Sequence, residues 1–294
     1  MSLQELIGAG TKKDLWGQPV LTAENVSITY EVDPPVHAVK NVSLTLKRGE
    51  ILGLAGESGC GKTTLAFGMN QLLKPPAHFR EGKVTFHDES GEDIIVSELV
   101  GEKLRRFRWD KISMVFQGAM NSLNPVVTVR KQLHDVFTTH RPGMRKDERE
   151  ARSARLLERV NVDPRRLGSY AHELSGGMRQ RVMIAMALAL NPQVMIMDEP
   201  TTALDVVVQR GILREIMELR EEFGFAVIFI THDLPMLLEI SDRIAVMLEG
   251  EIVEFDSAEN IYKNAQHPYT RRLLSSFPSL TGKRGDFVRT GGHQ

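Results

Sequence analysis

The segment ILGLAGESGCGKTT at residues 51–64 constrains the fold of this chain more than any other. It opens with a continuous apolar run, which is typical of a strand buried inside a parallel sheet. The run leads at once into GESGCGKTT, which matches the pattern G-x-x-x-x-G-K-[ST], and then into the start of a helix. A strand, a glycine-rich loop and a helix in this order predict a nucleotide-binding α/β sheet with residues 51–55 in its interior.

Residues 56–64, here called the phosphate-binding loop, carry the first set of predicted nucleotide contacts. Successive backbone N–H groups would wrap the β-phosphate, Lys62 would reach the β- and γ-phosphates, and the Thr63 hydroxyl would coordinate Mg²⁺. The predicted nucleotide-binding residues of the loop are Gly56, Glu57, Ser58, Gly59, Cys60, Gly61, Lys62, Thr63 and Thr64. Cys60 is interpreted as a small residue with outward space, and redox control is the alternative.

A second apolar run, VMIMDEP, supplies the other half of a metal site. Four apolar residues place Asp198 at the carboxyl end of a buried strand, where α/β sheets hold their ligands. Asp198 would hold the Mg²⁺ through water, and Glu199 would polarise the attacking water. A solvated carboxylate at a strand end is the alternative for both residues.

Two further polar side chains follow apolar runs of the same kind. His232 ends the run in FITHD, and Gln117 ends SMVFQ. The carboxyl ends of parallel strands meet at one edge of a sheet, so His232 could contact the γ-phosphate and Gln117 could contact Mg²⁺ or water. A purely structural role is the alternative at each position.

The glycine pair of LSGGMRQ raises a separate question. Ser175 is a good helix N-cap, but Gly176 and Gly177 in the first turn cost about 1 kcal/mol each relative to alanine. A helix N-terminus offers free N–H groups and a partial positive charge, which favour an anion close to the backbone. A buried helix weakened by its glycines is the alternative.

The rest of the chain predicts two additions to this α/β core. NVSITYEV and NVSLTLKRGE alternate apolar and polar residues, as antiparallel strands do, and RIAVMLEGEIVEFD reads as a hairpin that turns at Glu249-Gly250. Helices are expected from Lys62 to Lys74, at 97–108, and over the whole of 128–174. Composition is that of a globular protein, with 41% hydrophobic residues and net charge −1, and no apolar run approaches the ~20 residues of a membrane span. The single cysteine excludes an internal disulfide.

Six motifs follow one another in an order that is no longer generic: GESGCGKTT, Gln117, LSGGMRQR, VMIMDEP, TTALD and THD. Together they resemble the ATPase subunit of ATP-binding cassette (ABC) transporters, over residues 21–278. The resemblance implies an α/β fold with a P-loop NTPase (RecA-like) core, an antiparallel β-subdomain and an α-helical subdomain. The expected division is an N-terminal extension at 1–20, an ABC ATPase domain at 21–265 with its helical subdomain at about 118–176, and a short C-terminal extension at 266–294.

The resemblance also implies roles for residues in both halves of a dimer. In that family two cassettes pack head to tail, so residues 175–177 would bind the γ-phosphate of ATP that a neighbouring subunit holds. Tyr30 matches the aromatic residue that stacks on adenine. Gln117 and His232 match the residues that contact the γ-phosphate and water, and Asp205 matches the loop that crosses the dimer interface.

Three segments resemble the dipeptide/oligopeptide importer branch: LSGGMRQR, MNSLNPVVTV and HPYTRRLLSSFPSL. That branch keeps its permeases as separate chains. The implied partners are a second ATPase subunit (a copy or a relative), two integral-membrane permeases and, indirectly, a solute-binding protein, at the cytoplasmic face of the cell membrane and without nucleic acid. Residues 118–125 would dock the permeases. The absence of a cysteine cluster excludes the iron–sulfur centre of some members, and the cargo stays open among peptides, nickel, glutathione-like solutes and oligosaccharides.

The alternative from another class is a non-transport cassette that acts on nucleic acid or ribosomes. Its only local support is the basic run RRFR at 105–108, which is better interpreted as a solvated helix face. A catalytically inactive, regulatory cassette is disfavoured because Lys62, Glu199, Ser175 and His232 are all present.

Overall fold

The computed structural model describes residues 13–118, 122–202 and 204–275. The strands are β1 (Pro19–Tyr30), β2 (Val36–Lys47), β3 (Ile51–Ala55), β4 (Ala77–His87), β5 (Asp93–Ile95), β6 (Ile112–Val115), β7 (Val194–Asp198), β8 (Ala226–Ile230), β9 (Arg243–Leu248) and β10 (Glu251–Ser257). The α-helices are α2 (Lys62–Met69), α3 (Gly101–Asp110), α4 (Val129–His140), α5 (Lys146–Arg159), α6 (Gly176–Leu188), α7 (Val206–Phe223), α8 (Leu234–Ile240), α9 (Ala258–Asn264) and α10 (Pro268–Ser275). Short 3₁₀ helices are η1 (Lys13–Leu15), η2 (Val96–Glu98), η4 (Pro164–Gly168) and η5 (Ala171–Glu173).

The central sheet has six strands in the order β10-β9-β3-β8-β7-β6. β9, β3, β8, β7 and β6 run parallel, and β10 pairs antiparallel with β9 at the edge. Every residue of β3, β7 and β8 is buried. The strand predicted at residues 51–55 is therefore an interior strand of a parallel sheet, as its unbroken apolar run required.

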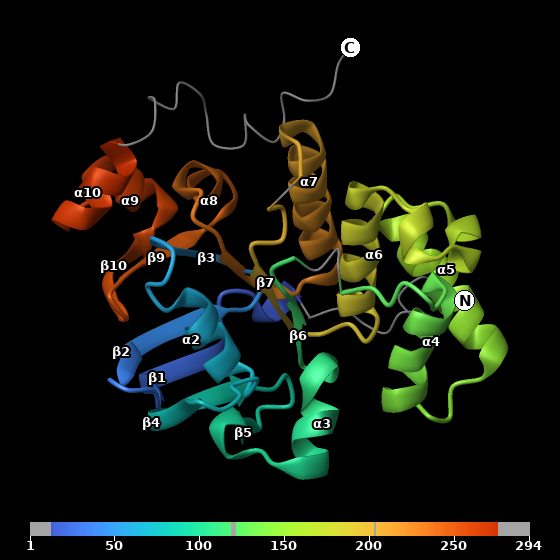
Figure 1. The fold of residues 1–294 in the computed structure, drawn as a ribbon, viewed down its shortest axis with the longest axis horizontal. Coiled ribbons are helices and arrows are strands. Elements are labelled where there is room, and N and C mark those ends of the chain that lie inside the picture. Colours follow the sequence, from blue (N-terminus) through green and yellow to red (C-terminus); the bar gives the residue numbers. More distant parts are fainter. Residues whose placement is uncertain (1–12, 119–121, 203, 276–294) are drawn as a thin grey trace.

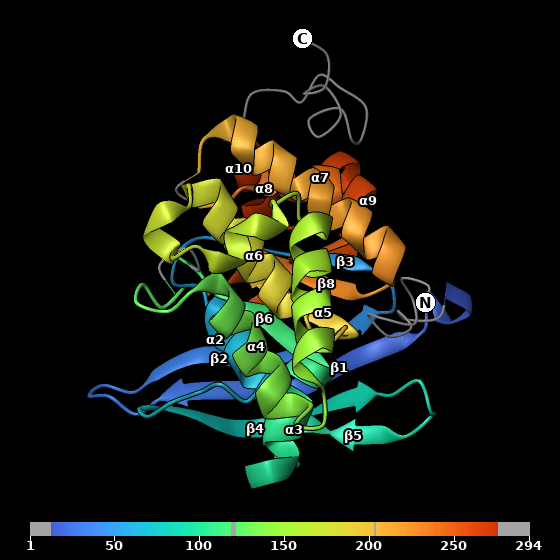
Figure 2. The same cartoon turned by 90° about the vertical axis from the view of Figure 1, so that its right-hand side faces the viewer.

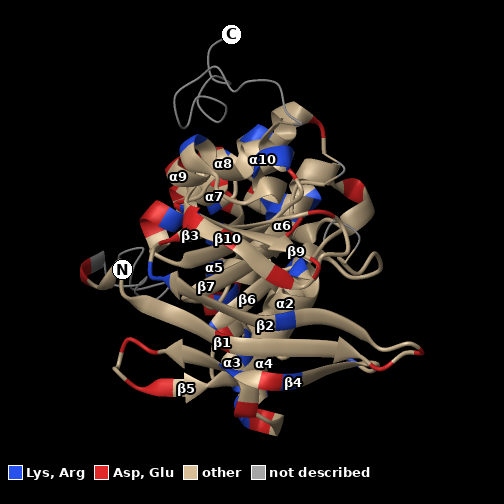
Figure 3. Cartoon of the chain, turned by 90° about the vertical axis from the view of Figure 1, so that its left-hand side faces the viewer, with Lys and Arg blue, Asp and Glu red and all other residues tan. Residues whose placement is uncertain are grey.

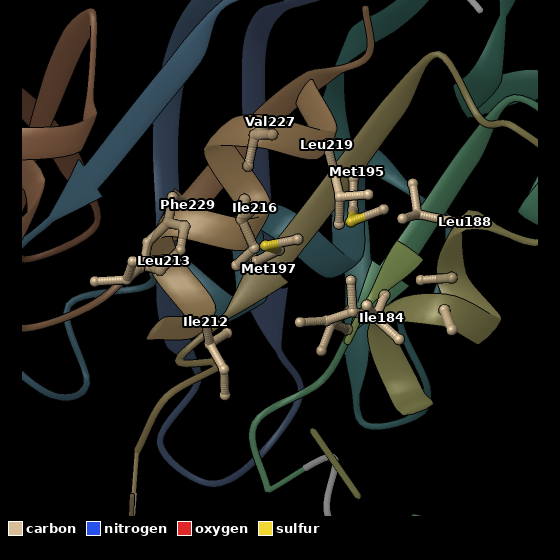
Figure 4. Packing of buried hydrophobic residues seen from close by; sticks show 14 of the residues in the cluster. Ile184, Leu188, Met195, Met197, Ile212, Leu213, Ile216, Leu219, Val227 and Phe229 are labelled. Atoms are coloured by element: carbon tan, nitrogen blue, oxygen red, sulfur yellow. The ribbon is translucent and has the colours of Figure 1, made fainter. Parts of the chain in front are cut away.

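The two faces of the central sheet line two different hydrophobic cores. Ile51 and Ala55 of β3 lie in one core, and Leu52 and Leu54 lie in the other, because successive side chains of a strand point to opposite faces. The first core joins the sheet to α6, α7 and α8, and Figure 4 shows Met195, Met197 and Phe229 packed against residues of α6 and α7.

The second core joins the central sheet to a smaller antiparallel sheet of order β2-β1-β4-β5. In Figures 1 and 2 this sheet and α2 lie below the central sheet, with α7 to α10 above it. The predicted antiparallel strands before residue 51 are confirmed as β1 and β2. The hairpin is confirmed as β9 and β10, joined at Glu249 and Gly250, whose φ angles are 47° and 89°.

Three helix predictions need correction. The helix that starts at Lys62 ends at Met69 and not at Lys74, because the chain turns at Gln71, whose φ is 51°. The segment at 128–174 is not wholly helical: α4 and α5 are joined by the turn around Gly143, and 3₁₀ turns follow α5. The helix expected at 97–108 is divided into η2 and α3. The domain boundaries remain a prediction.

The run RRFR lies at the end of α3, and its interpretation as a solvated face is wrong at Arg108. The Arg108 guanidinium is partly buried and donates to the backbone carbonyls of Asn70 and Gln71, just after α2. Phe107 is buried, while Arg105 and Arg106 pair with Glu102. Two residues of the run therefore pack against the rest of the molecule, and the other two form ion pairs at the surface.

On the side drawn in Figure 3, basic and acidic residues are interspersed. None of the helices within the described residues combines the length and the apolar composition that a membrane span requires.

Candidate functional site

The phosphate-binding loop follows β3 and is pressed against neighbouring backbone. Gly56 has a φ of 146° and Gly61 a φ of 106°, which favour glycine. A Cβ at Gly56 would lie 2.3 Å from the carbonyl oxygen of Met247, and one at Gly61 would lie 2.2 Å from that of Ala38. Glycine is therefore required at both positions by the close approach of β2 and β9, before any ligand is considered.

The Lys62 side chain is folded back onto the loop. It is 7% exposed, and its Nζ donates to the carbonyl oxygens of Gly56 (2.7 Å) and Glu57 (2.8 Å). These are hydrogen bonds to neutral acceptors, and a phosphate oxygen is a stronger partner for an ammonium group. The Lys62 ammonium group therefore lies beside the loop, where it can exchange these carbonyl partners for the oxygens of a bound phosphate.

The sequence-based interpretation of Cys60 as a small residue with outward space is wrong. It is buried, 7% exposed, and its Sγ lies 3.6 Å from Lys62 Nζ. A Cβ at Gly56 would lie 2.7 Å from the same sulfur. The thiol therefore fills the space that the missing side chain of Gly56 leaves inside the loop, and it does not face outward.

Asp198 ends β7 beside the start of α2 and has the properties of a metal ligand. It is 2% exposed, and its Oδ1 has no hydrogen-bond partner among the residues that the structure describes. Burial raises the pKa of its carboxyl, while a hydrogen bond with Thr63 and the charge of Lys62 act in the opposite direction. A buried carboxylate oxygen that lacks a partner, next to a threonine hydroxyl, fits the oxygen ligands that Mg²⁺ prefers.

Glu199 is the centre of a cluster of polar side chains. Its Oε1 lies 3.0 Å from His232 Nδ1, and its Oε2 accepts hydrogen bonds of 3.0 Å from Gln117 Nε2 and Thr202 Oγ1. Burial would raise the pKa of Glu199, but the hydrogen bonds with His232 and Thr202 lower it below its usual value. The carboxylate is therefore charged at neutral pH and held at both oxygens.

Adjacent parallel strands bring this cluster together. Asp198 pairs with Ile230, and Met197 pairs with Val115, so β6, β7 and β8 end side by side and the polar residues follow at one edge. Glu199 itself has a φ of 45°, in the left-handed region that is costly for residues other than glycine, and its N–H donates to the Ile230 carbonyl at 2.9 Å. This turn directs the Glu199 side chain toward its partners from the neighbouring strands.

Tyr30 ends β1 close to the helix that follows the phosphate-binding loop. Its hydroxyl lies 3.1 Å from Thr64 Oγ1 on α2, and its side chain is half-buried. The tyrosine is therefore placed beside the loop, and its contact with adenine remains a prediction.

Ser175 caps α6 as expected, since its hydroxyl accepts from the Met178 N–H at 3.3 Å. Asp205 likewise caps α7, by accepting from the Val208 N–H at 2.9 Å. The packing of the protein itself explains why residue 177 is glycine, because a Cβ there would lie 2.8 Å from Cγ1 of Val208. What approaches the backbone at Gly177 is α7, so a ligand is not needed to explain that glycine.

Two residues near the site were missed by the sequence reasoning. Thr202 binds Glu199, and a hydroxyl three residues after the glutamate in DEPTT was the available signal. Tyr269 lies in the segment HPYTRRLLSSFPSL, but nothing in that segment predicts its contact: the Tyr269 hydroxyl accepts from the Glu57 N–H in the phosphate-binding loop, 212 positions away.

Comparison with known proteins shows which families and relatives the chain is similar to. Residues 39–202 match the family model described as ABC transporter, and residues 253–294 match the one described as oligopeptide/dipeptide transporter, C-terminal region. The chain is 43% identical over 276 residues to the glutathione import ATP-binding protein GsiA of Salmonella typhimurium strain LT2, and 43% identical over 275 residues to that of Escherichia coli strain K12. Each alignment covers 92% of this chain and 44% of the relative, so the chain spans less than half the length of these relatives.

Solved structures with a similar fold are also found. One is the dimeric, post-hydrolysis state of the ATP-binding cassette MJ0796 bound to ADP and Pi, with a TM-score of 0.70 and 32% identity over 81% of this chain and 98% of that chain. Another is cbiO1 from Clostridium perfringens, part of the transporter complex cbiONQ, with a TM-score of 0.70 and 27% identity over 84% of this chain and 91% of that chain.

Proposed function

The chain belongs to the ABC transporter family, and on that premise we propose that it is the ATP-hydrolysing nucleotide-binding subunit of an importer. It powers the uptake of peptides or similar small solutes through separate permease subunits. The observation that carries the proposal is the Glu199 carboxylate, held by His232, Gln117 and Thr202 at the sheet edge beside Lys62 and Asp198.

The residues at this edge of the central sheet have separate roles in phosphoryl transfer. Lys62 leaves the loop carbonyls and pairs with the β- and γ-phosphates, while the amides of the phosphate-binding loop surround the β-phosphate. Glu199 orients the attacking water and accepts hydrogen bonds from it as a charged carboxylate, and His232 contacts the γ-phosphate. Thr63, Asp198 and Gln117 would hold Mg²⁺, which neutralises the charge on the phosphate oxygens when bound. The adenine stacks on Tyr30.

The second half of each site comes from a neighbouring cassette. Residues 175–177 at the start of α6 present free N–H groups and the positive end of the helix dipole to the γ-phosphate that the neighbour holds. Asp205 lies at the same interface, and Val206 and Val207 beside it are 55% and 80% exposed. The dimeric cassette MJ0796 supports this arrangement. ATP then binds both subunits only when they are closed, so its differential affinity drives closure and its hydrolysis releases them.

Partners and cargo follow from the relatives. The oligopeptide/dipeptide transporter match and the glutathione import relatives support a peptide-class solute. The cbiONQ complex supports assembly with membrane subunits. These are expected to dock near residues 118–125, of which residues 119–121 lie outside the described residues. The chain works at the cytoplasmic face of the cell membrane, with a solute-binding protein as an indirect partner. All of these relatives are transport proteins or transporter cassettes, so no observation favours the alternative that acts on nucleic acid or ribosomes.

A mixing experiment tests the shared site. Ser175→Arg blocks the contact with the neighbour's phosphate, and Lys62→Ala removes the contact within the subunit, so each variant alone should lose hydrolysis. A mixed dimer regains one intact site, with Lys62 from one subunit and Ser175 from the other. Recovery of ATP hydrolysis on mixing is the expected result, and Ser175→Arg alone should still bind ATP. No recovery from two variants that dimerise with ATP would refute the shared site.

Purification tests the transport role. The tagged chain is recovered from detergent-solubilised native membranes, and the proteins that accompany it are identified by mass spectrometry. Two proteins with several membrane spans and a second cassette are expected. Recovery with ribosomes or DNA instead would overturn the transport function and leave the ATP chemistry standing.

A further inference from the structure

A contact between α10 and the phosphate-binding loop has no part in the function described above. The Glu57 N–H donates a hydrogen bond of 2.9 Å to the hydroxyl of Tyr269. Tyr269 is 4% exposed, and Thr270 next to it is fully buried, so this helix is packed into the molecule. Figure 1 shows α10 above the edge of the central sheet, and its neighbour among the helices is α8. A side chain of the C-terminal region therefore reaches the backbone of the nucleotide site.

The position of Tyr269 is set by the edge strand β10. The Glu254 carboxylate accepts hydrogen bonds from the N–H groups of Gln266 (2.6 Å) and His267 (3.2 Å), just before α10 begins. His267 Nδ1 in turn accepts from the Tyr269 N–H at 3.2 Å. The start of α10 is thus hydrogen-bonded to the same sheet that carries the phosphate-binding loop, and the tyrosine hydroxyl is held in a defined place.

The Glu57 residue of the loop is held on both sides. Its N–H donates to Tyr269, and its carbonyl oxygen accepts from Lys62 Nζ at 2.8 Å. When Lys62 moves to a phosphate, it gives up that carbonyl, and the Tyr269 hydroxyl keeps its contact with the amide. Because a loop that is already ordered loses less conformational entropy on binding, this contact favours the nucleotide.

We propose that Tyr269 is a positioning residue of the nucleotide site, which holds the phosphate-binding loop in the conformation that accepts ATP. The inference rests on the proposed function and adds α10 to its site. It also reassigns Glu57, whose N–H serves this contact and is not among the donors free to wrap the phosphate.

Two neighbouring contacts add to the same support. The Gly250 N–H, in the turn between β9 and β10, donates to the Cys60 carbonyl at 3.1 Å, so the loop is held at a second point of its backbone. Arg272 lies 3.7 Å from the Glu57 carboxylate and 5.3 Å from the Tyr269 ring centre. Both partners of that ion pair are more than half exposed, so it contributes little and Tyr269 is the residue to test.

The test compares Tyr269→Phe with a matched control, Tyr262→Phe, which removes the hydroxyl of an exposed tyrosine on α9. ATP affinity of the full chain is measured by titration calorimetry, and KM and kcat by phosphate release. Loss of one hydrogen bond predicts a roughly three- to tenfold weaker affinity and a similar rise in KM for Tyr269→Phe, with kcat unchanged. Thermal unfolding without nucleotide shows whether the free protein keeps its stability.

The outcomes separate the inference from the function on which it rests. Unchanged ATP affinity in Tyr269→Phe, with or without a change in the stability of the free protein, overturns the inference, and so does an equal loss of affinity in Tyr262→Phe. If the wild-type chain itself binds no ATP, the proposed function fails instead. A weaker affinity confined to Tyr269→Phe, with the free protein as stable as the wild type, supports the positioning role.

Discussion

Gly177 offers a direct test of why the first turn of α6 contains glycine. In the structure, α7 crosses this turn so closely that a Cβ at Gly177 would lie 2.8 Å from Cγ1 of Val208. Real Cβ atoms do not approach a methyl carbon to that distance, so α6 or Val208 must shift in Gly177→Ala. The change therefore measures how tightly the two helices are packed.

The expected magnitude is a balance of two terms. Replacing glycine by alanine in a helix stabilises the helix by up to ~1 kcal/mol, while an extra methyl group in a well-packed contact costs ~1–3 kcal/mol. We expect Gly177→Ala to lower the free energy of unfolding by ~1 kcal/mol. Val208→Ala removes the atom that clashes, so the double variant should be more stable than the sum of the single effects predicts, with a coupling of ~1 kcal/mol.

The assay is urea unfolding of the full chain, followed by circular dichroism at one temperature, with the m-values compared. Gly211→Ala on α7 is the control, because its Cβ would meet only the end of the Arg181 side chain at 3.5 Å. That variant should be as stable as the wild type or slightly more so. If Gly177→Ala behaves like Gly211→Ala, and its effect simply adds to that of Val208→Ala, the packing explanation is refuted.

Three further predictions test the roles of charged side chains in catalysis and in the stability of the fold. Glu199→Gln keeps the hydrogen-bonding shape but removes the charge that orients water, so kcat for ATP hydrolysis should fall at least ~100-fold, about 2.7 kcal/mol, while ATP still binds; near-normal turnover would contradict the role of Glu199, and the exposed Glu218→Gln serves as control. Arg181→Met leaves the buried Glu215 carboxylate without its two-pronged partner and should destabilise the fold by ~3 kcal/mol in urea unfolding, whereas replacing both by apolar residues should recover most of the loss. Burial raises the pKa of Asp88 but its hydrogen bond with Lys111 helps to lower it to about 2, so this pair stabilises the fold above the unfolded pKa near ~4 and loses its effect as the pH falls toward 2. Asp88→Asn should therefore be less stable than the wild type at about pH 7, and the difference should shrink below about pH 4; a constant difference would contradict the pairing.

Local patterns in the sequence predicted most of the fold and most of the candidate site. The unbroken apolar runs before the phosphate-binding loop, Glu199 and His232 identified interior parallel strands, because only strands buried on both faces lack alternation. Once those strands are parallel, the polar residues that follow them must meet at one edge. That geometry accounts for the Glu199, His232 and Gln117 cluster, while the catalytic roles of its members remain to be measured.

Helix ends were predicted less well, because they depend on neighbours outside the helix. The apolar and polar residues after Met69 would continue a helix to Lys74, yet the carbonyls of Asn70 and Gln71 accept from Arg108, and the chain turns there. The same contact buries part of the Arg108 side chain, although the run RRFR by itself favours a solvated helix face.

By itself, the sequence predicted the two local motifs of the candidate site, because the phosphate-binding loop and the strand-end carboxylates are each built from residues close together in the chain. Only the tertiary structure decided which neighbours those residues have. The thiol of Cys60 faces inward, Gly177 is required by α7, and Tyr269 reaches Glu57 across 212 positions. The contacts of Gly177 and Tyr269 join segments that are distant in sequence, and no local period or motif encodes which distant side chain will fill a given space when the layers pack. The inward position of the Cys60 thiol depends on the folded shape of its own loop, where it fills the space beside Gly56.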